Sequence, residues 1–348
     1  MPAAFLSAAL LRDPAQRSVR IIARARLQRV LEEAARVEVR AGAVPSALPP
    51  VGPGPDSADP EAIHDFRVAL RRLRAWLRAF RPCLEDTVER DSERRMRSLS
   101  RLAGRARDLE VQYAWLTGLR RAGPARDAAR RLAAGIGRQL VRARRALAKE
   151  VVAELPAAAA ELAGELEHYR QDVALEQPAE ERMAAAMAWA VQREAGTLAA
   201  ELQRVRRPGQ VAAAHAARIA VKRLRYLLEG FGRSSRSATG ILAGLTAMQH
   251  LFGELHDAQV LRRRAAGSPP VLRALLARRV SAAFRSVERT IRAPATREMF
   301  SRIEALVRRL ERTAPDRAPS PRSPRPASTS RRTLPTRPSP TGASSGAP

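Results

Sequence analysis

Cysteine, aromatic residues and long apolar runs are scarce in this sequence, and each shortage excludes a class of protein. Cys83 is the only cysteine in 348 residues, so an internal disulfide and the paired cysteines of a zinc finger are both excluded. No stretch reaches the roughly 18 consecutive apolar residues that a membrane-spanning helix needs. The apolar run at residues 1–11 has no preceding basic residue, unlike a secretory signal peptide. We therefore expect a cytoplasmic protein that does not enter a membrane.

The shortage of aromatic and β-branched residues also bears on the fold class. Aromatic residues make up only 4% of the chain, whereas alanine, leucine and arginine dominate. These three favour helices over sheets, and a 45% share of hydrophobic residues can form a real core. The composition therefore predicts an all-α protein.

Acidic residues are too few to balance the basic ones. The chain has 63 Lys and Arg against 35 Asp and Glu, which gives a formal net charge of +28. A charge this far from neutrality favours a polyanionic partner. An arginine-rich composition alone could also place that charge on an ordinary solvated surface. The positions of the basic residues along the chain distinguish a polyanion-binding surface from such an ordinary surface.

Residues 64–81 predict a helix with one basic face and one apolar face. At about 100° per residue, the basic side chains fall within an arc of roughly 100° and the large apolar ones lie opposite. Asp59 and Pro60 are typical of a helix start, and Pro82 ends it. The basic arc contains His64, Arg67, Arg71, Arg74, Arg78 and Arg81, and the apolar arc contains Phe66, Leu70, Leu73, Trp76, Leu77 and Phe80.

The same pattern recurs later in the chain. At an offset of 151 (64 to 215), the motif reappears as His215, Arg218, Lys222, Arg223, Leu224 and Arg225, with an apolar arc of Val221, Leu224, Leu227, Leu228 and Phe231. Gly104 and Asp108 recur as Gly253 and Asp257 at an offset of 149, while Arg107 stands in the place of His256. Two groups of landmarks at nearly one offset indicate an internal repeat.

The rest of the chain reads as further helices and two non-helical segments. Apolar periodicity and breaker residues predict helices at 15–41, 86–103, 109–119, 124–155, 157–173, 178–205, 270–292 and 296–312, with a helix break at Gly104. Residues 43–57 are rich in proline and predict a connecting loop. Residues 313–348 lack apolar periodicity and predict a disordered tail rich in Pro, Ser and Arg.

Each basic face offers cationic groups at one-turn intervals of about 5.4 Å, which suits a linear chain of phosphates. Ordinary solvated faces mix charges of both signs, whereas these two do not. His64 and His215 begin the two faces. Each either donates a hydrogen bond to phosphate or bonds the neighbouring backbone, and the sequence leaves both open.

The repeated His-x-x-Arg-x-x-x-Lys/Arg-Arg-x-Arg motif, together with Leu251 to Ala258, resembles the CHAD family, the conserved histidine α-helical domain. The resemblance covers residues 15–312. It implies two pseudo-symmetric four-helix units packed as one domain, with repeat one at 15–175 and repeat two at 178–312. It further implies binding of inorganic polyphosphate on basic surfaces. We expect this binding to be non-catalytic, and its purpose is left open between targeting to polyphosphate granules, protecting polymer ends and regulating a partner. The binding residues expected from the motif and the basic arcs are His64, Arg67, Arg71, Arg72, Arg74, Arg78, His215, Arg218, Lys222, Arg223, Arg225 and His256. We expect no cofactor and no catalytic residue.

Other functions remain as alternatives. His64-Asp65 and His256-Asp257 spell the His-Asp pair of metal phosphohydrolases, but the surrounding arginines would repel a cation, and Asp108 and Asp257 read better as helix caps or ion-pair partners. Non-specific binding to the backbone of DNA or RNA suits the net charge, although so few aromatic residues give little support for base stacking. The proline-rich tail could also recruit other proteins.

Overall fold

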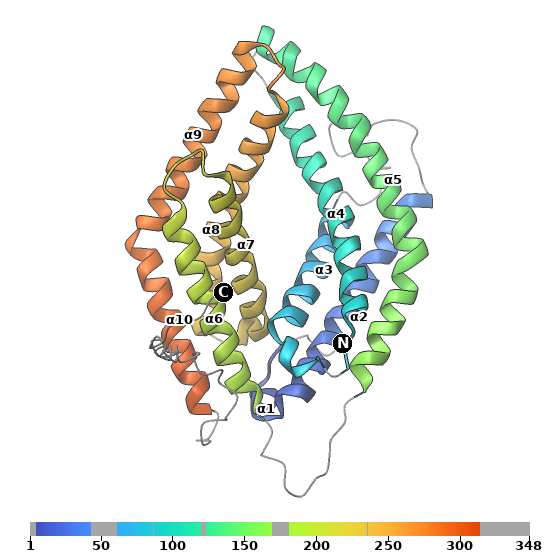
Figure 1. Cartoon of the computed structure of the whole chain (residues 1–348), viewed down its shortest axis with the longest axis vertical. Coiled ribbons are helices and arrows are strands. Elements are labelled where there is room, and N and C mark those ends of the chain that lie inside the picture. Colours follow the sequence, from blue (N-terminus) through green and yellow to red (C-terminus); the bar gives the residue numbers. More distant parts are fainter. Residues whose placement is uncertain are drawn as a thin grey trace, which may run out of the picture. The chain divides into compact units, whose positions relative to one another are not determined.

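The computed structural model describes residues 5–42, 61–85, 87–119, 123–168, 181–234 and 236–313. All of them belong to one compact unit that spans Met1–Ala314. Within these ranges the chain forms helices and no strand, apart from an isolated bridge between Pro14 and Arg182 (Figure 1). The predicted all-α class is confirmed. None of the helices in the described part is both long and apolar enough to cross a membrane.

The first half of the unit contains a short helix followed by four long ones. These are α1 (Ala8–Arg12), α2 (Ala15–Gly42), α3 (Ala62–Ala79), α4 (Arg90–Thr117) and α5 (Pro124–Glu167), with a 3-10 turn at Arg81–Cys83. The helix α2 packs on α3, α3 on α4, α4 on α5, and α5 returns to α2. The four long helices therefore form a closed bundle.

The second half repeats this arrangement with one helix divided. Its elements are α6 (Met183–Arg204), α7 (Val211–Leu228), a 3-10 segment at Glu229–Ser234, α8 (Arg236–Arg264), α9 (Pro270–Arg292) and α10 (Pro294–Thr313). Helices α6, α7 and α8 pack in sequence, α9 packs on α8, and α10 packs on α6 and α8. Together α9 and α10 take the place that α5 has in the first half, so the two halves are related helix by helix.

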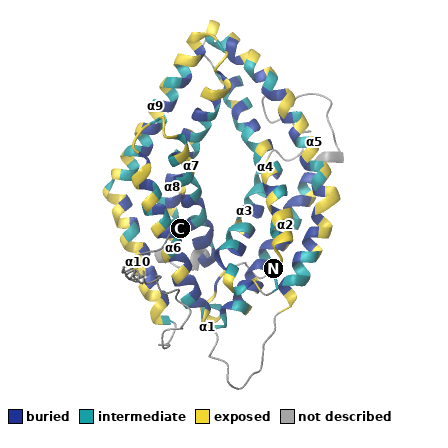
Figure 2. Cartoon of the chain, in the orientation of Figure 1, coloured by how far each residue is buried: buried dark blue, intermediate teal, exposed yellow. Residues whose placement is uncertain are grey.

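The core lies where the apolar periodicity places it (Figure 2). All the residues of the apolar arc of α3, from Phe66 to Phe80, are buried, and so is the corresponding arc of α7. On α2 the predicted stripe from Val19 to Val37 is also buried. The basic arcs therefore face away from the core of their own bundle.

Two predicted helix breaks are wrong, and packing explains both. Gly104 does not break α4, because the turns around it bury Leu99, Ala103, Ala106 and Leu109, which outweighs the roughly 1 kcal/mol that an interior glycine costs. Pro156 lies inside α5, where burial of Leu155, Ala158, Ala159 and Leu162 carries the helix past a residue that costs about 3 kcal/mol. The helix α3 begins at Ala62 with Glu61 at the N-cap position, whereas the predicted cap Asp59 lies outside the described residues.

Several predictions fall on residues that the structure does not describe. They are the loop at 43–57, Asp59 and Pro60 at the start of the basic helix, the last residues of the helix predicted at 157–173, and the tail at 314–348. The predicted C-terminal end of the last helix, at residue 312, is confirmed within one residue, because α10 ends at Thr313. The short helix α1 was not predicted, because its five residues are too few to show a period.

Candidate functional site

The basic faces of the two repeats meet where α3 contacts α7. The Arg71 guanidinium of α3 lies 5.7 Å from the ring centre of Tyr226 on α7. Arg71 and Arg67 act electrostatically on Lys222, and Arg218 acts on Arg71. We call Arg67, Arg71, Arg218 and Lys222 the cationic cluster. Because each repeat supplies half of it, a single site contains corresponding residues of both copies of the motif.

Lys222 is buried and Arg67, Arg71 and Arg218 are half-buried, and for Lys222, Arg71 and Arg218 the loss of solvent changes the titration. Lys222 is only 5% exposed. Burial lowers the pKa of its ammonium group to about 5, and the positive charges of Arg71, Arg218 and Arg67 act in the same direction. Burial likewise lowers the pKa of Arg71 to about 10 and lowers that of Arg218. The folded chain thus holds these groups where their charged forms are disfavoured.

Few acids compensate for the cluster. Arg67 Nη2 lies 3.2 Å from Asp108 Oδ1 of α4. Arg71, Arg218 and Lys222 form no ion pair within the part of the chain that the structure describes, and Arg218 Nε is buried without a hydrogen-bond acceptor there. Asp257 on α8 is close enough to influence Arg218, but burial raises the pKa of its own carboxyl. The cluster therefore has an excess of cationic groups over acids.

Three histidines border the cluster. The rings of His215 and His256 have their centres 5.5 Å apart, and burial lowers the pKa of both, that of His256 to about 4. In the other repeat His64 lies near Arg107, which takes the place of His256, and burial lowers the pKa of His64 as well. Nδ1 of His64 and Nδ1 of His256 are buried without a hydrogen-bond partner in the described structure. For His64, Nδ1 therefore does not bond the neighbouring backbone, which was one of the two readings that the sequence left open for His64 and His215.

The remaining predicted residues point to other partners. Arg72 Nε donates to Glu229 Oε2 at 2.6 Å, and Arg225 donates to Gln249 Oε1 at 2.9 Å and pairs with Glu229. Arg78 pairs with the buried Glu194 of α6 at 2.9 Å. Arg74 lies beside Arg97 and Arg101 of α4, and the charge of Arg223 reaches Arg78. The structure thus divides the predicted set into the cluster, a pair held by Glu229 and a group near α4 and α6.

One residue at this site, Tyr226, has a role that was not predicted from the sequence, and a second, Asp108, takes one of its two predicted roles. Tyr226 has the Arg225 guanidinium 4.6 Å from its ring centre as well as Arg71, so both arginines can stack on one ring. The one feature of the sequence that could have indicated this role is the position of Tyr226 directly after the second motif. Asp108 lies inside α4, so it pairs with arginine as one prediction held, and the helix-cap alternative is wrong.

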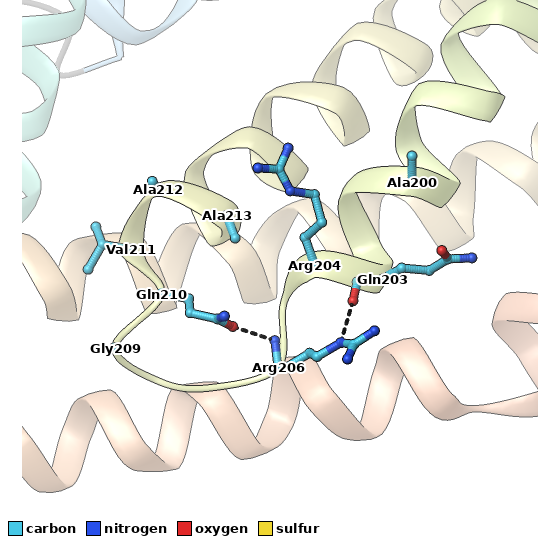
Figure 3. A pocket seen from close by; sticks show the side chains of 9 residues that line it. All are labelled: Ala200, Gln203, Arg204, Arg206, Gly209, Gln210, Val211, Ala212 and Ala213. Atoms are coloured by element: carbon cyan, nitrogen blue, oxygen red, sulfur yellow. Dashed lines mark hydrogen bonds between the residues drawn. The ribbon is translucent and has the colours of Figure 1, made fainter.

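Among the described residues no group of side chains at the cluster could hold a metal ion. In the described ranges no group of three or more His, Cys, Asp and Glu side chains could hold a metal ion, and His250 Nδ1 lies 3.9 Å from Glu254 Oε1. A surface pocket of about 770 Å³ lies at the turn between α6 and α7 (Figure 3). There Arg206 N donates to Gln210 Oε1 at 2.8 Å and Arg206 Nε to Gln203 O at 3.1 Å. None of the predicted binding residues lines this pocket.

Comparison with known proteins agrees with the repeated motif. The family model of the CHAD domain matches residues 54–266, well over half of the chain. The chain belongs to the CHAD domain family. The crystal structure of the CHAD domain from the plant Ricinus communis is similar in fold, with a TM-score of 0.55 and 21% identity over 88% of this chain and 97% of that one. PptA from Streptomyces chartreusis matches with a TM-score of 0.49 and 16% identity over 84% of this CHAD protein and 100% of its own chain. No curated protein matches the sequence.

Proposed function

We propose that this CHAD domain binds inorganic polyphosphate at the cationic cluster. One observation carries the proposal: Arg71, Arg218 and Lys222 come from both repeats, Arg71 and Arg218 lie close enough to lower the pKa of Lys222, and none of the three has an ion-pair partner among the described residues. Bringing like charges together under neighbouring helices costs free energy that a bound polyanion would recover. Arginine and lysine both suit phosphate oxygens.

The burial of Lys222 among half-buried arginines supports polyphosphate over duplex nucleic acid as the preferred ligand. Duplex DNA carries its phosphates on the outside of a wide rod, which suits exposed cations. A polyphosphate chain is narrow and flexible, so its phosphates can approach Lys222 although that residue is only 5% exposed. Duplex DNA and RNA remain the competing ligands because the net charge of +28 attracts any polyanion.

The proposed role is binding without catalysis. The cluster offers cations and hydrogen-bond donors to phosphate oxygens along a chain, and holding the polymer requires no bond to break. Retention of the protein on polyphosphate granules in the cytoplasm would follow from such binding. We therefore include granule association in the proposal.

A cluster variant tests the proposal directly. Arg71→Gln combined with Lys222→Met removes the two groups that are both cationic when a phosphate chain is bound, and it buries no new charge. We expect the affinity for long-chain polyphosphate to fall about 100-fold, since a hydrogen bond to a charged group contributes about 1.5–3 kcal/mol. The matched control, Arg285→Gln with Arg289→Gln, removes the same charge from an exposed face of α9 and should change affinity less than about threefold. Equal effects of the two double variants would contradict the proposal.

A competition experiment separates the ligands. Protein loaded with labelled duplex DNA at moderate salt should release it when long-chain polyphosphate is added at equal phosphate concentration. Persistence of the DNA complex would favour the nucleic-acid alternative. Phosphate release from polyphosphate in the presence of Mg²⁺ or Mn²⁺, abolished by His256→Gln, would contradict a non-catalytic role.

A further inference from the structure

Two ion pairs fix how α3 and α4 run alongside each other. Arg67 pairs with Asp108 at 3.2 Å, and Arg81 pairs with Glu93 at 2.6 Å. The two helices are therefore antiparallel, and the segments between the pairs are about 21 Å long at 1.5 Å per residue. Arg74 lies near the middle of this interval, where Arg97 and Arg101 of α4 act on it electrostatically.

The interval between these ion pairs contains basic residues and no acid. Residues 68–80, which comprise the later part of α3 and its C-cap residue Phe80, and residues 94–107 of α4 include neither Asp nor Glu. Arg97 and Arg101 are exposed and one turn apart on the same face of α4. Within the described ranges, Arg74, Arg97 and Arg101 form no ion pair or hydrogen bond through their side chains, whereas Arg78 is held by Glu194 of α6. We call Arg74, Arg97 and Arg101 the α3–α4 strip.

The second repeat lacks this strip. At the offset of 149 that relates the two halves (104 to 253), Arg97 and Arg101 correspond to Thr246 and His250. At the offset of 151, Arg78 corresponds to Glu229, and Arg74 corresponds to Arg225. The Arg225 guanidinium is already bound by Glu229 and Gln249. The cluster is thus shared by both repeats, but its basic continuation belongs to the first repeat alone.

We propose that the α3–α4 strip is a further phosphate-binding site that extends the cationic cluster on one side only. This inference rests on the proposed function. A short oligophosphate fills the cluster and does not reach Arg97 and Arg101. A long polyphosphate chain occupies the cluster and then passes over the first repeat, where three unpaired guanidinium groups bind its next phosphates. The strip therefore makes the domain prefer long chains.

The test compares two chain lengths on one variant. Arg97→Gln with Arg101→Gln changes only exposed side chains, so the fold is retained, which the helical circular dichroism signal and the melting temperature check. We expect the affinity for long-chain polyphosphate to fall about five- to tenfold, and the affinity for tripolyphosphate to change less than twofold. The slope of log affinity against log salt for the long chain should shrink by about 1.4, since each lost contact to a flexible strand removes about 0.7.

Two further variants keep the inference falsifiable. The control Arg285→Gln with Arg289→Gln on α9 removes the same charge outside the strip and should leave the preference for long chains unchanged. Thr246→Arg with His250→Arg creates the missing half of the strip in the second repeat and should raise the affinity for the long chain only. If the strip variant behaves as the α9 control does, or loses tripolyphosphate and the long chain equally, the strip is not a separate site.

Failure of this inference is distinguishable from failure of the proposed function. If Arg71→Gln with Lys222→Met leaves binding of both ligands intact, the cluster is not the polyphosphate site and the proposed function is wrong. If that variant loses both ligands while the strip variant retains wild-type affinity for the long chain, only the strip is refuted.

Discussion

Arg71 and Arg72 are neighbours in the motif, yet the structure gives them different partners. Arg71 lies in the cluster beside Tyr226 without an ion pair in the described part of the chain, while Arg72 donates to Glu229 and is 44% exposed. The motif alone assigns both arginines to ligand binding. It contains no information about Glu229, which lies more than 150 residues away in the sequence. The tertiary structure shows that the Arg72 guanidinium is already paired with Glu229, whereas the Arg71 guanidinium has no ion pair in the described part of the chain.

This separation predicts unequal effects of two adjacent substitutions. Arg71→Gln should weaken polyphosphate binding about tenfold, because it removes a charged hydrogen-bond donor from a desolvated site. Arg72→Gln should weaken it less than about threefold, because it breaks a partly exposed ion pair. Isothermal titration calorimetry with long-chain polyphosphate measures both. A larger effect at Arg72 would mean that Glu229 releases it to the ligand.

Lys222 predicts a pH dependence with a defined sign. Arg67 and Arg71 on α3, Asp108 on α4, and His215, Arg218, His256 and Asp257 on α7 and α8 surround it. Its pKa of about 5 in the free protein means that it is neutral at pH 7–9, and a bound phosphate chain favours its charged form. Binding should therefore take up a proton, and affinity should rise as the pH falls from 9 to 7.

Calorimetry in two buffers with different ionisation enthalpies measures that proton uptake. Long chains are the suitable ligand, because they have few end groups that titrate themselves. The same linkage acts on folding: the unfolded chain protonates Lys222 below about pH 10.5 and the folded chain only below about 5, so the ligand-free protein should gain stability as the pH rises between these values. Lys222→Met should reduce both effects, and an unchanged proton uptake would contradict the assignment.

At the scale of elements, α4 and α5 show where helix prediction fails. Gly104 and Pro156 are residues of types that end helices in isolated segments, and local propensity predicts a helix boundary at both. In the folded chain each lies within one continuous helix whose next turn is buried. Local propensity gave the type of these segments correctly, and packing against α2, α3 and α4 decided their length.

The helix α5 provides a prediction of stability. Pro156 is exposed and inside the helix, so Pro156→Ala restores a backbone donor without disturbing the core. We expect the free energy of unfolding to rise by about 1–3 kcal/mol. Chemical denaturation measures it, with Glu154→Ala on the same exposed surface as the control. A loss of stability would show that α5 needs the proline for its path along the bundle.

At the scale of the whole molecule, the repeat is the feature that organises the site. Each bundle alone presents half of the cluster, and the contact of α3 with α7 makes one site from two motifs. The two halves are not equivalent, because α9 and α10 replace α5 and because Glu229 stands where the first repeat has Arg78. An internal repeat of this kind can therefore bind one ligand asymmetrically.

A shared site predicts the stoichiometry of a short ligand. Tripolyphosphate should bind once per chain, because both motifs contribute to the same cluster. Two independent motifs would instead bind it twice, and Arg71→Gln would then remove one of two sites and leave the other at full affinity. Calorimetric titration separates these outcomes, and a stoichiometry of two would contradict the shared cluster.

The sequence by itself determined the helical class, the buried faces of α2, α3 and α7, and the repeated basic motif. These features follow from periodicity within single helices, where neighbours three and four residues apart share a face. The tertiary structure decided which basic residues meet. Lys222 became buried because α3 packs against α7, and Arg72 and Arg225 were neutralised because Glu229 lies between them. Burial and charge pairing across helices depend on distances between residues far apart in the chain, and no local pattern encodes those distances.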